Sequence, residues 1–171
     1  YPWLGCLGEG YEVPSLWGVK EDVYCAGKDS TFVFLEDVLT EVTDLFPYGL
    51  VHIGGDECPK ARWKECPRCQ RRMRDEGLGS EEELQSYFVR RIERFLASRN
   101  RRMVGWDEIR QGGLSETAIV LSRKREQGLR SALENGNDVI MTPYMNSYFD
   151  YYQGSRETEP LAFGGFLPLR T

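Results

Sequence analysis

The stretch Val51-His52-Ile53-Gly54-Gly55-Asp56-Glu57 places two adjacent carboxylates directly after a short apolar run. The apolar residues on either side of His52 predict a buried strand over residues 50–54, and the paired glycines predict a sharp turn at its end. In parallel α/β folds, the carboxyl ends of the strands face the ligand-binding crevice. Asp56 and Glu57 are therefore predicted at a ligand site, although an arbitrary Asp-Glu pair is usually a solvated turn.

The spacing of apolar residues predicts alternating helices and strands along the rest of the chain. Helices are predicted over residues 31–46, 61–76, 80–99 and 126–134, and further strands over 102–106, 119–122 and 139–141. Ser30 or Thr31 is a candidate cap for the first helix, and Ser80 with Glu83 has the spacing of a capping box. Strands and helices that alternate in this way predict parallel βα units.

Charge and hydropathy exclude two classes of partner. The net charge of −5 and the isoelectric point near 5.1 argue against nucleic acid. The arginines are interspersed with acids, as on a salt-bridged helix surface. No apolar run reaches the length of about 18 residues that a membrane span requires. We therefore expect neither nucleic-acid binding nor a membrane span in this chain.

Five cysteines form an odd set, and three of them lie close together in the sequence. Cys66-Pro-Arg-Cys69 has the two-residue gap of a zinc knuckle, and Cys58 lies upstream of it. A structural zinc site uses four ligands, and the only histidine, His52, lies in the predicted strand. The sequence shows no fourth ligand, so we predict no metal; a disulfide among these thiols and reduced thiols under a loop remain open.

His52-Ile-Gly-Gly-Asp-Glu57 resembles the signature of the β-N-acetylhexosaminidases of glycoside hydrolase family 20. Other stretches resemble the same family in the same order: Tyr1-Pro-Trp-Leu-Gly-Cys6, Phe46-Pro47, Gly105-Trp-Asp-Glu-Ile109, Asp138-Val-Ile-Met-Thr-Pro143 and Tyr148-Phe-Asp-Tyr-Tyr-Gln153. The resemblance covers essentially the whole chain and is strongest to the enzymes of gut Bacteroidetes. A Gram-negative glycan degrader of this kind would act in the periplasm, at the cell surface or outside the cell.

The resemblance implies a (β/α)8 TIM barrel, which typically needs about 250 residues. With 171 residues, the chain is interpreted as a single fragment of the catalytic domain that carries approximately strands four to seven with their helices. Residues 1–30 would form an ordered loop, 31–153 the βα units, and 154–171 a loop toward the last strand. The rest of the barrel or a partner chain would then be needed for activity. The alternative, a complete small α/β domain, would leave an open sheet edge.

The resemblance also implies the reaction, in which a terminal β-linked N-acetylhexosamine is removed from a glycan with retention of configuration. Family 20 uses the substrate's own acetamido group in place of a second catalytic carboxylate. Glu57 would be the general acid/base, and Asp56 would orient the acetamido group and stabilise the cationic intermediate. No metal or organic cofactor is implied.

Further site residues follow from the resemblance. Trp106 would wall the sugar pocket, Tyr148 would bind the acetamido group, and Asp150 would contact a sugar hydroxyl. His52 and Asp107 would support the site without touching the substrate, and Glu108 has no assigned role. A buried core position for Trp106 is the alternative, because tryptophan is mostly buried wherever it occurs.

One stretch departs from the family pattern. Ser122-Arg123-Lys124-Arg125 stands where the family usually has Ser-Trp-Arg-Gly, so an arginine replaces an aromatic wall of the pocket. A guanidinium is costly to desolvate, which would weaken binding of the acetamido methyl group. A carbohydrate-binding protein without hydrolytic activity is therefore the second interpretation. A cysteine-stapled interaction module is a third, but it leaves Asp56 and Glu57 without a role.

Overall fold

The computed structural model describes residues 1–16, 18–123 and 127–168. Its helices and strands are α1 (Asp29–Leu45), β1 (Leu50–His52), α2 (Ala61–Glu65), α3 (Pro67–Asp75), α4 (Glu81–Ser98), β2 (Arg102–Trp106), β3 (Ile119–Ser122), α5 (Gln127–Glu134), β4 (Asp138–Met141) and α6 (Tyr144–Ser147), with 3-10 turns η1 (Pro2–Leu4) and η2 (Asp107–Arg110). The predicted strands over 102–106 and 119–122 are confirmed without a shift.

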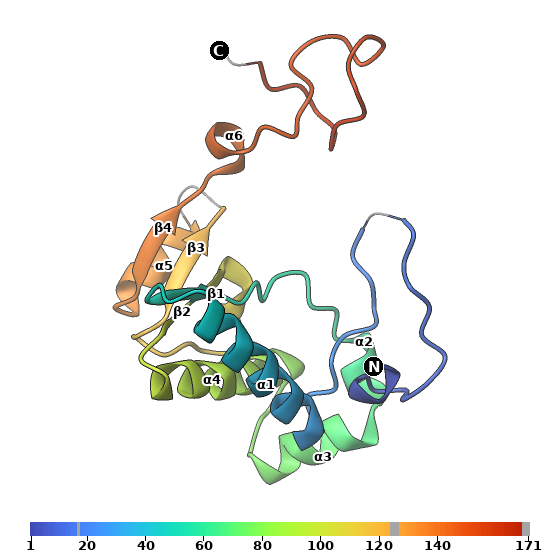
Figure 1. Ribbon diagram of the computed structural model, residues 1–171, viewed down its shortest axis with the longest axis vertical. Coiled ribbons are helices and arrows are strands. Elements are labelled where there is room, and N and C mark those ends of the chain that lie inside the picture. The colour runs from blue at the N-terminus through green and yellow to red at the C-terminus, as the bar shows by residue number, and fades with distance from the viewer. Residues whose placement is uncertain (17, 124–126, 169–171) are drawn as a thin grey trace.

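The strands form one parallel sheet in the order β1-β2-β3-β4 (Figure 1). Neighbours in the sheet are also neighbours along the chain, and the order never reverses. A doubly wound sheet reverses its strand order at a switch point, whereas a barrel adds its strands in sequence. The observed order is therefore the one expected in a barrel and not across the switch point of a doubly wound sheet. α4 lies between β1 and β2 in the chain, and α5 lies between β3 and β4.

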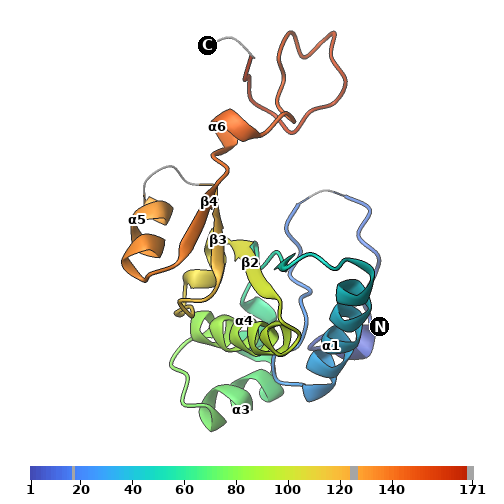
Figure 2. The ribbon, with the colours of Figure 1, turned by 60° about the vertical axis from the view of Figure 1, so that its left-hand side comes forward.

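The core lies where α4 packs between the sheet and the neighbouring helices (Figure 2). Its fully or nearly fully buried side chains include Phe32, Trp63, Leu84, Ile92, Leu96, Met103 and Ile109. The apolar residues whose spacing predicts the helix over residues 80–99 include Leu84 and Ile92, which lie in this core, and Phe88 and Phe95, which are only partly buried. Burial of each such side chain contributes about 1.5–3 kcal/mol to stability.

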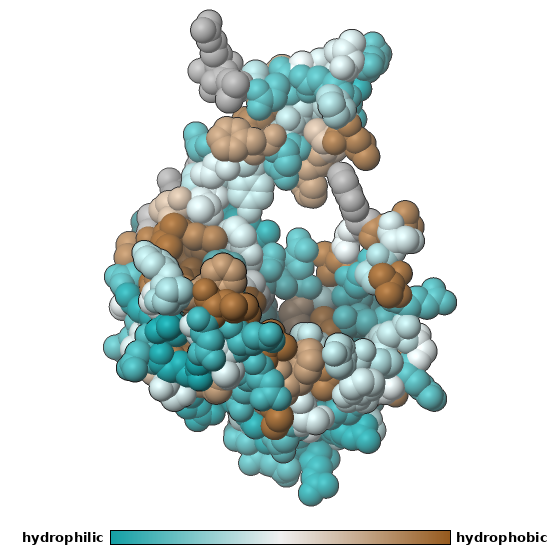
Figure 3. Space-filling model, in the orientation of Figure 1, coloured by the Kyte–Doolittle hydropathy of each residue, from teal (hydrophilic) through white to brown (hydrophobic). Residues whose placement is uncertain are grey.

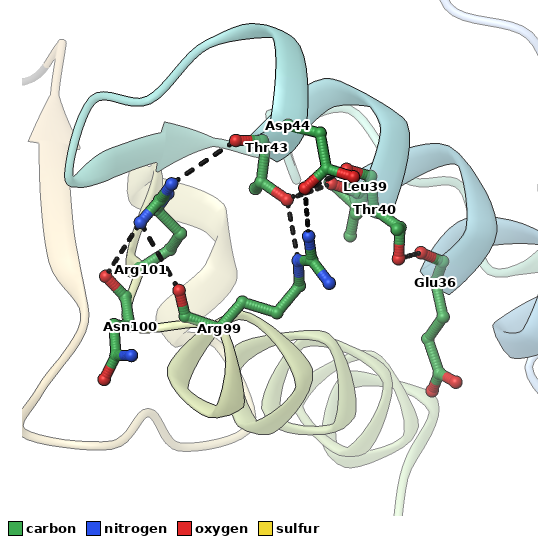
Figure 4. A network of polar contacts seen from close by, with 8 residues as sticks. All are labelled: Glu36, Leu39, Thr40, Thr43, Asp44, Arg99, Asn100 and Arg101. Carbon is green, nitrogen blue, oxygen red and sulfur yellow. Dashed lines mark hydrogen bonds and ion pairs between the residues drawn. The ribbon is translucent and has the colours of Figure 1, made fainter.

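Polar contacts fix the carboxyl end of α1 against the end of α4 (Figure 4). The Arg99 guanidinium donates to the Thr43 hydroxyl at 2.7 Å and pairs with the Asp44 carboxylate. Arg101 donates to the Thr43 carbonyl at 3.3 Å. Thr43 is buried, so these contacts satisfy a polar group that burial would otherwise penalise.

The apolar residues whose spacing predicts the first helix, among them Val38 and Leu45, do not form a core face. Val38 is 38% exposed and Leu45 is 69% exposed, and Figure 3 shows hydrophobic residues exposed on the face that carries α1 and β1. Within the described residues, no strand pairs with the outer edge of β1 or of β4. Two open edges beside an uncovered helix are consistent with an incomplete barrel.

Element boundaries differ from the predictions at several places. The helix predicted over 61–76 is two helices, because the chain is extended at Cys66 and Pro67 starts a new helix. α1 begins earlier than predicted, at Asp29, and neither Ser30 nor Thr31 caps it among the described residues. The strand predicted over 50–54 ends at His52. The predicted start of a helix at 126 lies outside the described residues.

The carboxyl-terminal part of the chain extends beyond the sheet. α6 and residues 148–168 lead away from β4 (Figure 1), and the segment is held by its own contacts, such as the 2.8 Å bond from the Leu167 amide to the Tyr152 carbonyl. None of the described helices combines the length and the hydropathy of a membrane span.

The cap of α4 gives a stability prediction. Ser80 accepts a hydrogen bond from the Glu83 amide at 3.3 Å, as the capping-box spacing predicts. Ser80→Ala is expected to lower the free energy of unfolding by about 1 kcal/mol in urea denaturation. Ser30→Ala is the matched control, since Ser30 is exposed and caps nothing, and its effect should stay within about 0.5 kcal/mol. Equal losses in the two variants would contradict the assigned cap.

Candidate functional site

The paired glycines turn the chain sharply after β1. Gly54 and Gly55 have φ of 74° and 87°, a region that favours glycine. A Cβ on Gly55 would lie 2.4 Å from a side-chain carbon of Ile109, so a larger residue would collide with the turn after β2. The Trp106 amide donates to the Gly54 carbonyl at 2.9 Å. The turn is thus held against the end of β2.

The turn delivers Asp56 and Glu57 to the carboxyl edge of the sheet. Asp56 is half-buried and Glu57 is exposed. Glu57 also has a positive φ of 48°, which is uncommon for a residue with a side chain. Such conformations cost about 1–3 kcal/mol and are concentrated at functional sites. The strained backbone at Glu57 therefore marks this carboxylate as a candidate functional group.

Gln85 and Lys60, which the sequence analysis missed, bind the backbone of the loop that carries Asp56 and Glu57. Gln85 is buried on α4 and donates to the Gly55 carbonyl at 2.8 Å. Its side-chain oxygen accepts a hydrogen bond from Lys60, which also donates to the Cys58 carbonyl at 2.7 Å. The sequence signal that could have identified Gln85 was its place next to Leu84, as a polar residue on the apolar face of α4.

Asp56 and Glu57 both line a cavity of about 580 Å³. Its other walls come from the amino-terminal segment, α1, α4 and the α2 region, and include Tyr24, Leu39, Trp63, Gln85 and Phe88. Ligand sites typically have about 300–1,000 Å³ and combine apolar walls with a few polar groups. The cavity has the size and composition of such a site.

Arg123 pairs with two carboxylates, those of Asp56 and Glu108. Its guanidinium lies 3.3 Å from the Asp56 carboxylate and 3.1 Å from that of Glu108. It also lies 4.7 Å from the centre of the Trp106 ring, in cation-π contact. Burial alone would lower the pKa of the Arg123 guanidinium, but the carboxylates of Glu108 and Asp56 outweigh burial and raise it. Lys124 and Arg125, which follow it, lie outside the described residues.

Trp106, His52 and Asp107 lie beside this cluster. Trp106 ends β2 and is half-buried, and its ring meets the His52 ring edge-on with centres 5.2 Å apart. The buried Asp107 accepts a hydrogen bond from the Arg123 amide at 2.8 Å. Asp107 therefore fixes the backbone at the end of β3, whereas Trp106 presents its ring to Arg123.

Tyr148 and Asp150 differ in their relation to the acids. Tyr148 lies near enough to Arg123 to contribute to the raised pKa of that guanidinium. Asp150 is exposed and lines a separate hollow formed by residues of the carboxyl-terminal segment itself. The Phe163 amide donates to the Asp150 carbonyl at 2.7 Å. The structure brings Tyr148 toward the cluster but does not bring Asp150 to it, because the segment after Tyr148 packs on itself.

The fold and the site together define a class of protein. An acid pair at the carboxyl edge of a parallel sheet with barrel strand order is the arrangement of a barrel-type α/β enzyme. The sequence model described as glycosyl hydrolase family 20, catalytic domain, matches residues 2–170. The chain belongs to this family.

Relatives and solved structures agree with this assignment. The chain is 52% identical to a Beta-hexosaminidase of Porphyromonas gingivalis over 99% of its own length and 22% of the relative. It is 34% identical to a Beta-hexosaminidase of Vibrio furnissii, with 98% of this chain and 28% of the relative covered. The crystal structure of a β-N-acetylhexosaminidase from Bacteroides fragilis superposes with a TM-score of 0.79 at 30% identity, over 92% of this chain and 32% of that one.

An exo-β-N-acetylglucosaminidase from Vibrio harveyi, solved in complex with N-acetylglucosamine, matches with a TM-score of 0.73 at 32% identity, over 82% of this chain and 23% of that one. The chain thus spans between about a fifth and a third of the relatives and structures it matches. The family resemblance of the sequence, including its likeness to a Bacteroidetes enzyme, is confirmed.

The environment of His52 gives a pH prediction. Desolvation lowers the pKa of His52, partly opposed by the Asp56 carboxylate, and its Nδ1 accepts a hydrogen bond from the Gly54 amide at 3.0 Å. As the only histidine, it gives one set of imidazole signals in an NMR titration. We expect its pKa below the value of about 6.5 for an unfolded chain; a value at or above that of the urea-unfolded protein would contradict this environment.

The same shift sets the direction of a stability change. Between the folded pKa and about 6.5, the unfolded state binds more protons than the folded state. The stability due to neutral His52 should be fully present above that range and lost as the pH falls through the folded pKa.

Proposed function

We propose that this chain carries the catalytic carboxylates of a retaining β-N-acetylhexosaminidase that removes terminal β-linked GlcNAc or GalNAc from glycans. The observation that carries the proposal is the adjacent Asp56 and Glu57, which follow β1 and both line a cavity. The relatives are named Beta-hexosaminidase, and a matched structure contains N-acetylglucosamine. In this proposal the four strands are strands four to seven of a (β/α)8 barrel.

Glu57 acts as the general acid in the first step. Its carboxyl group donates a proton to the glycosidic oxygen as the bond to the anomeric carbon breaks. The exposed position of Glu57 at the cavity suits contact with a leaving group that remains attached to a larger glycan. In the second step the Glu57 carboxylate takes a proton from the attacking water.

Asp56 acts on the acetamido group of the substrate. Its carboxylate accepts the amide N–H and orients the carbonyl oxygen toward the anomeric carbon. Attack by that oxygen forms a cyclic oxazolinium ion, and the negative charge of Asp56 stabilises this cation. Water then opens the ring from the face that the leaving group occupied, so the configuration is retained.

Trp106 and Tyr148 complete the recognition of the acetamido group, with Trp106 as an apolar wall and Tyr148 as a hydroxyl donor. Asp150 is proposed to contact a sugar hydroxyl, which requires the segment after Tyr148 to lie closer to the sheet than it does here. His52 and Asp107 position the ring of Trp106 and the backbone of Arg123, respectively.

A carbohydrate-binding protein without hydrolytic activity is the second candidate. The observation that favours it is Arg123, which pairs with the Asp56 carboxylate that the substrate would use. An arginine in this place competes with the acetamido N–H for Asp56 and adds a charge where the family usually has an aromatic ring. The two candidates differ in turnover, not in binding.

The role of Glu57 is tested in a completed barrel, meaning a polypeptide that carries this chain together with the remaining strands of the fold. Glu57→Gln should lower turnover of N-acetylglucosaminides with poor leaving groups by roughly 10²–10⁴-fold, the usual contribution of a general acid. Activated aryl leaving groups need little protonation and should lose less. Initial rates over a series of aryl leaving groups give this comparison.

Glu65→Gln is the matched control, because Glu65 is exposed at the end of α2. Equal losses for good and poor leaving groups would contradict the acid assignment. A wild-type completed barrel that binds N-acetylglucosamine but hydrolyses none of the aryl substrates would favour the carbohydrate-binding protein.

A further inference from the structure

Four cysteines from distant parts of the sequence meet beneath the amino-terminal segment. Cys6 follows η1, Cys25 precedes α1, and Cys66 and Cys69 lie at the start of α3. The sulfur of Cys69 lies 3.8 Å from that of Cys6 and 3.6 Å from that of Cys25. The sulfurs of Cys25 and Cys66 are 3.8 Å apart, and all four lie within 4.8 Å of one another.

We propose that Cys6, Cys25, Cys66 and Cys69 bind a structural zinc ion. Zinc in structural sites is bound by four ligands in a tetrahedron, commonly four cysteine thiolates. With zinc–sulfur bonds of about 2.3 Å, the sulfurs of such a tetrahedron lie about 3.8 Å apart. The three nearest sulfur distances match this edge, and three of the four residues are buried, as a closed structural site requires.

The arrangement of the sulfurs favours a metal over two disulfides. The Cys25 sulfur is nearly equidistant from those of Cys66 and Cys69, and the Cys69 sulfur is nearly equidistant from those of Cys6 and Cys25. Disulfides would require two exclusive pairs, each with sulfurs at about 2.05 Å. Near-equal separations are those of ligands around a common centre. The same closeness leaves no room between the sulfurs for an iron–sulfur cluster.

The backbone brings the ligands together through contacts that do not involve a metal. A Cβ on Gly27 would lie 2.2 Å from the backbone of Arg68, so only glycine lets the Cys25 loop approach α3 this closely. The Trp63 indole donates to the Tyr24 carbonyl at 2.9 Å. The Cys66-Pro-Arg-Cys69 stretch adds the two-residue gap of a zinc knuckle.

The proposed site differs from the expectation, drawn from the sequence, that the chain binds no metal. The sequence analysis grouped Cys58 with Cys66 and Cys69 and found no fourth ligand. In the structure Cys58 is not part of the sulfur cluster, and Cys6 and Cys25 complete it. All five cysteines are free thiols here.

The zinc ion would tie the amino-terminal segment to the short helices α2 and α3. Helices of five and nine residues are marginal without tertiary support. Three neighbours of the ligands also line the cavity beside Glu57. Gly5 and Tyr24 are adjacent in the sequence to Cys6 and Cys25, and Trp63 donates to the Tyr24 carbonyl. The ion would therefore stiffen one wall of the cavity without touching the carboxylates.

The metal content of the wild-type chain tests the proposal directly. The protein is purified under reducing conditions, incubated with zinc and separated from unbound metal. Elemental mass spectrometry should then find one zinc per chain. A mercurial reagent that reacts with thiolates should release it. Cobalt in place of zinc should give sulfur-to-cobalt charge-transfer bands and the visible bands of tetrahedral cobalt.

Substitutions identify the ligands. Cys69→Ser and Cys25→Ser should each abolish stoichiometric zinc and the four-thiolate cobalt spectrum. Cys58→Ser is the matched control and should keep both, because Cys58 lies outside the cluster. The wild-type cobalt spectrum does not depend on any variant folding.

Three results would overturn the proposal: a reduced wild-type chain that binds no zinc, one that binds iron in preference to zinc, or peptide mapping that finds disulfides among the four cysteines in protein isolated without reductant. The measurements do not use hydrolysis, so they stand or fall independently of the proposed glycosidase activity.

Discussion

The close contact between the Gly54-Gly55 turn and the end of β2 is the constraint on which the candidate site depends. The Trp106 amide donates to the Gly54 carbonyl, and Gly55 and Gly105 both face Ile109, where any added Cβ would collide. Because glycine occupies these positions, two strand ends approach closely enough to share one site. Asp56 and Trp106 thereby both contact Arg123, although 50 residues separate them in the sequence.

Charge balance follows from this closeness. Asp56 and Glu108 lie at the same strand ends, and like charges brought together in a partly buried place repel each other. The Arg123 guanidinium lies between these two carboxylates and stacks on Trp106, so it both neutralises the site and occupies it. In the proposed mechanism, substrate binding would require Asp56 to exchange Arg123 for the acetamido N–H.

The sequence predicted those features that depend on local patterns. Strands β2 and β3 and the Ser80 cap were found because periodicity and capping residues act over a few positions. The break at Cys66 was missed, although Pro67 is a local signal for it. Contacts between distant segments were not predictable in this way. The approach of Cys6 to Cys69 spans 63 residues, and the position of Asp150 depends on how a long segment packs on itself.

The most direct measurement of the central claim uses a completed barrel and a series of aryl glucosaminides whose N-acetyl group carries none, one, two or three fluorine atoms. Each fluorine withdraws electrons from the carbonyl oxygen and weakens it as a nucleophile, with little change in size. If Asp56 directs that oxygen onto the anomeric carbon, turnover should fall steeply along the series, and Asp56→Asn should be slow with every member. Turnover that stays level along the series would contradict substrate-assisted catalysis at this site.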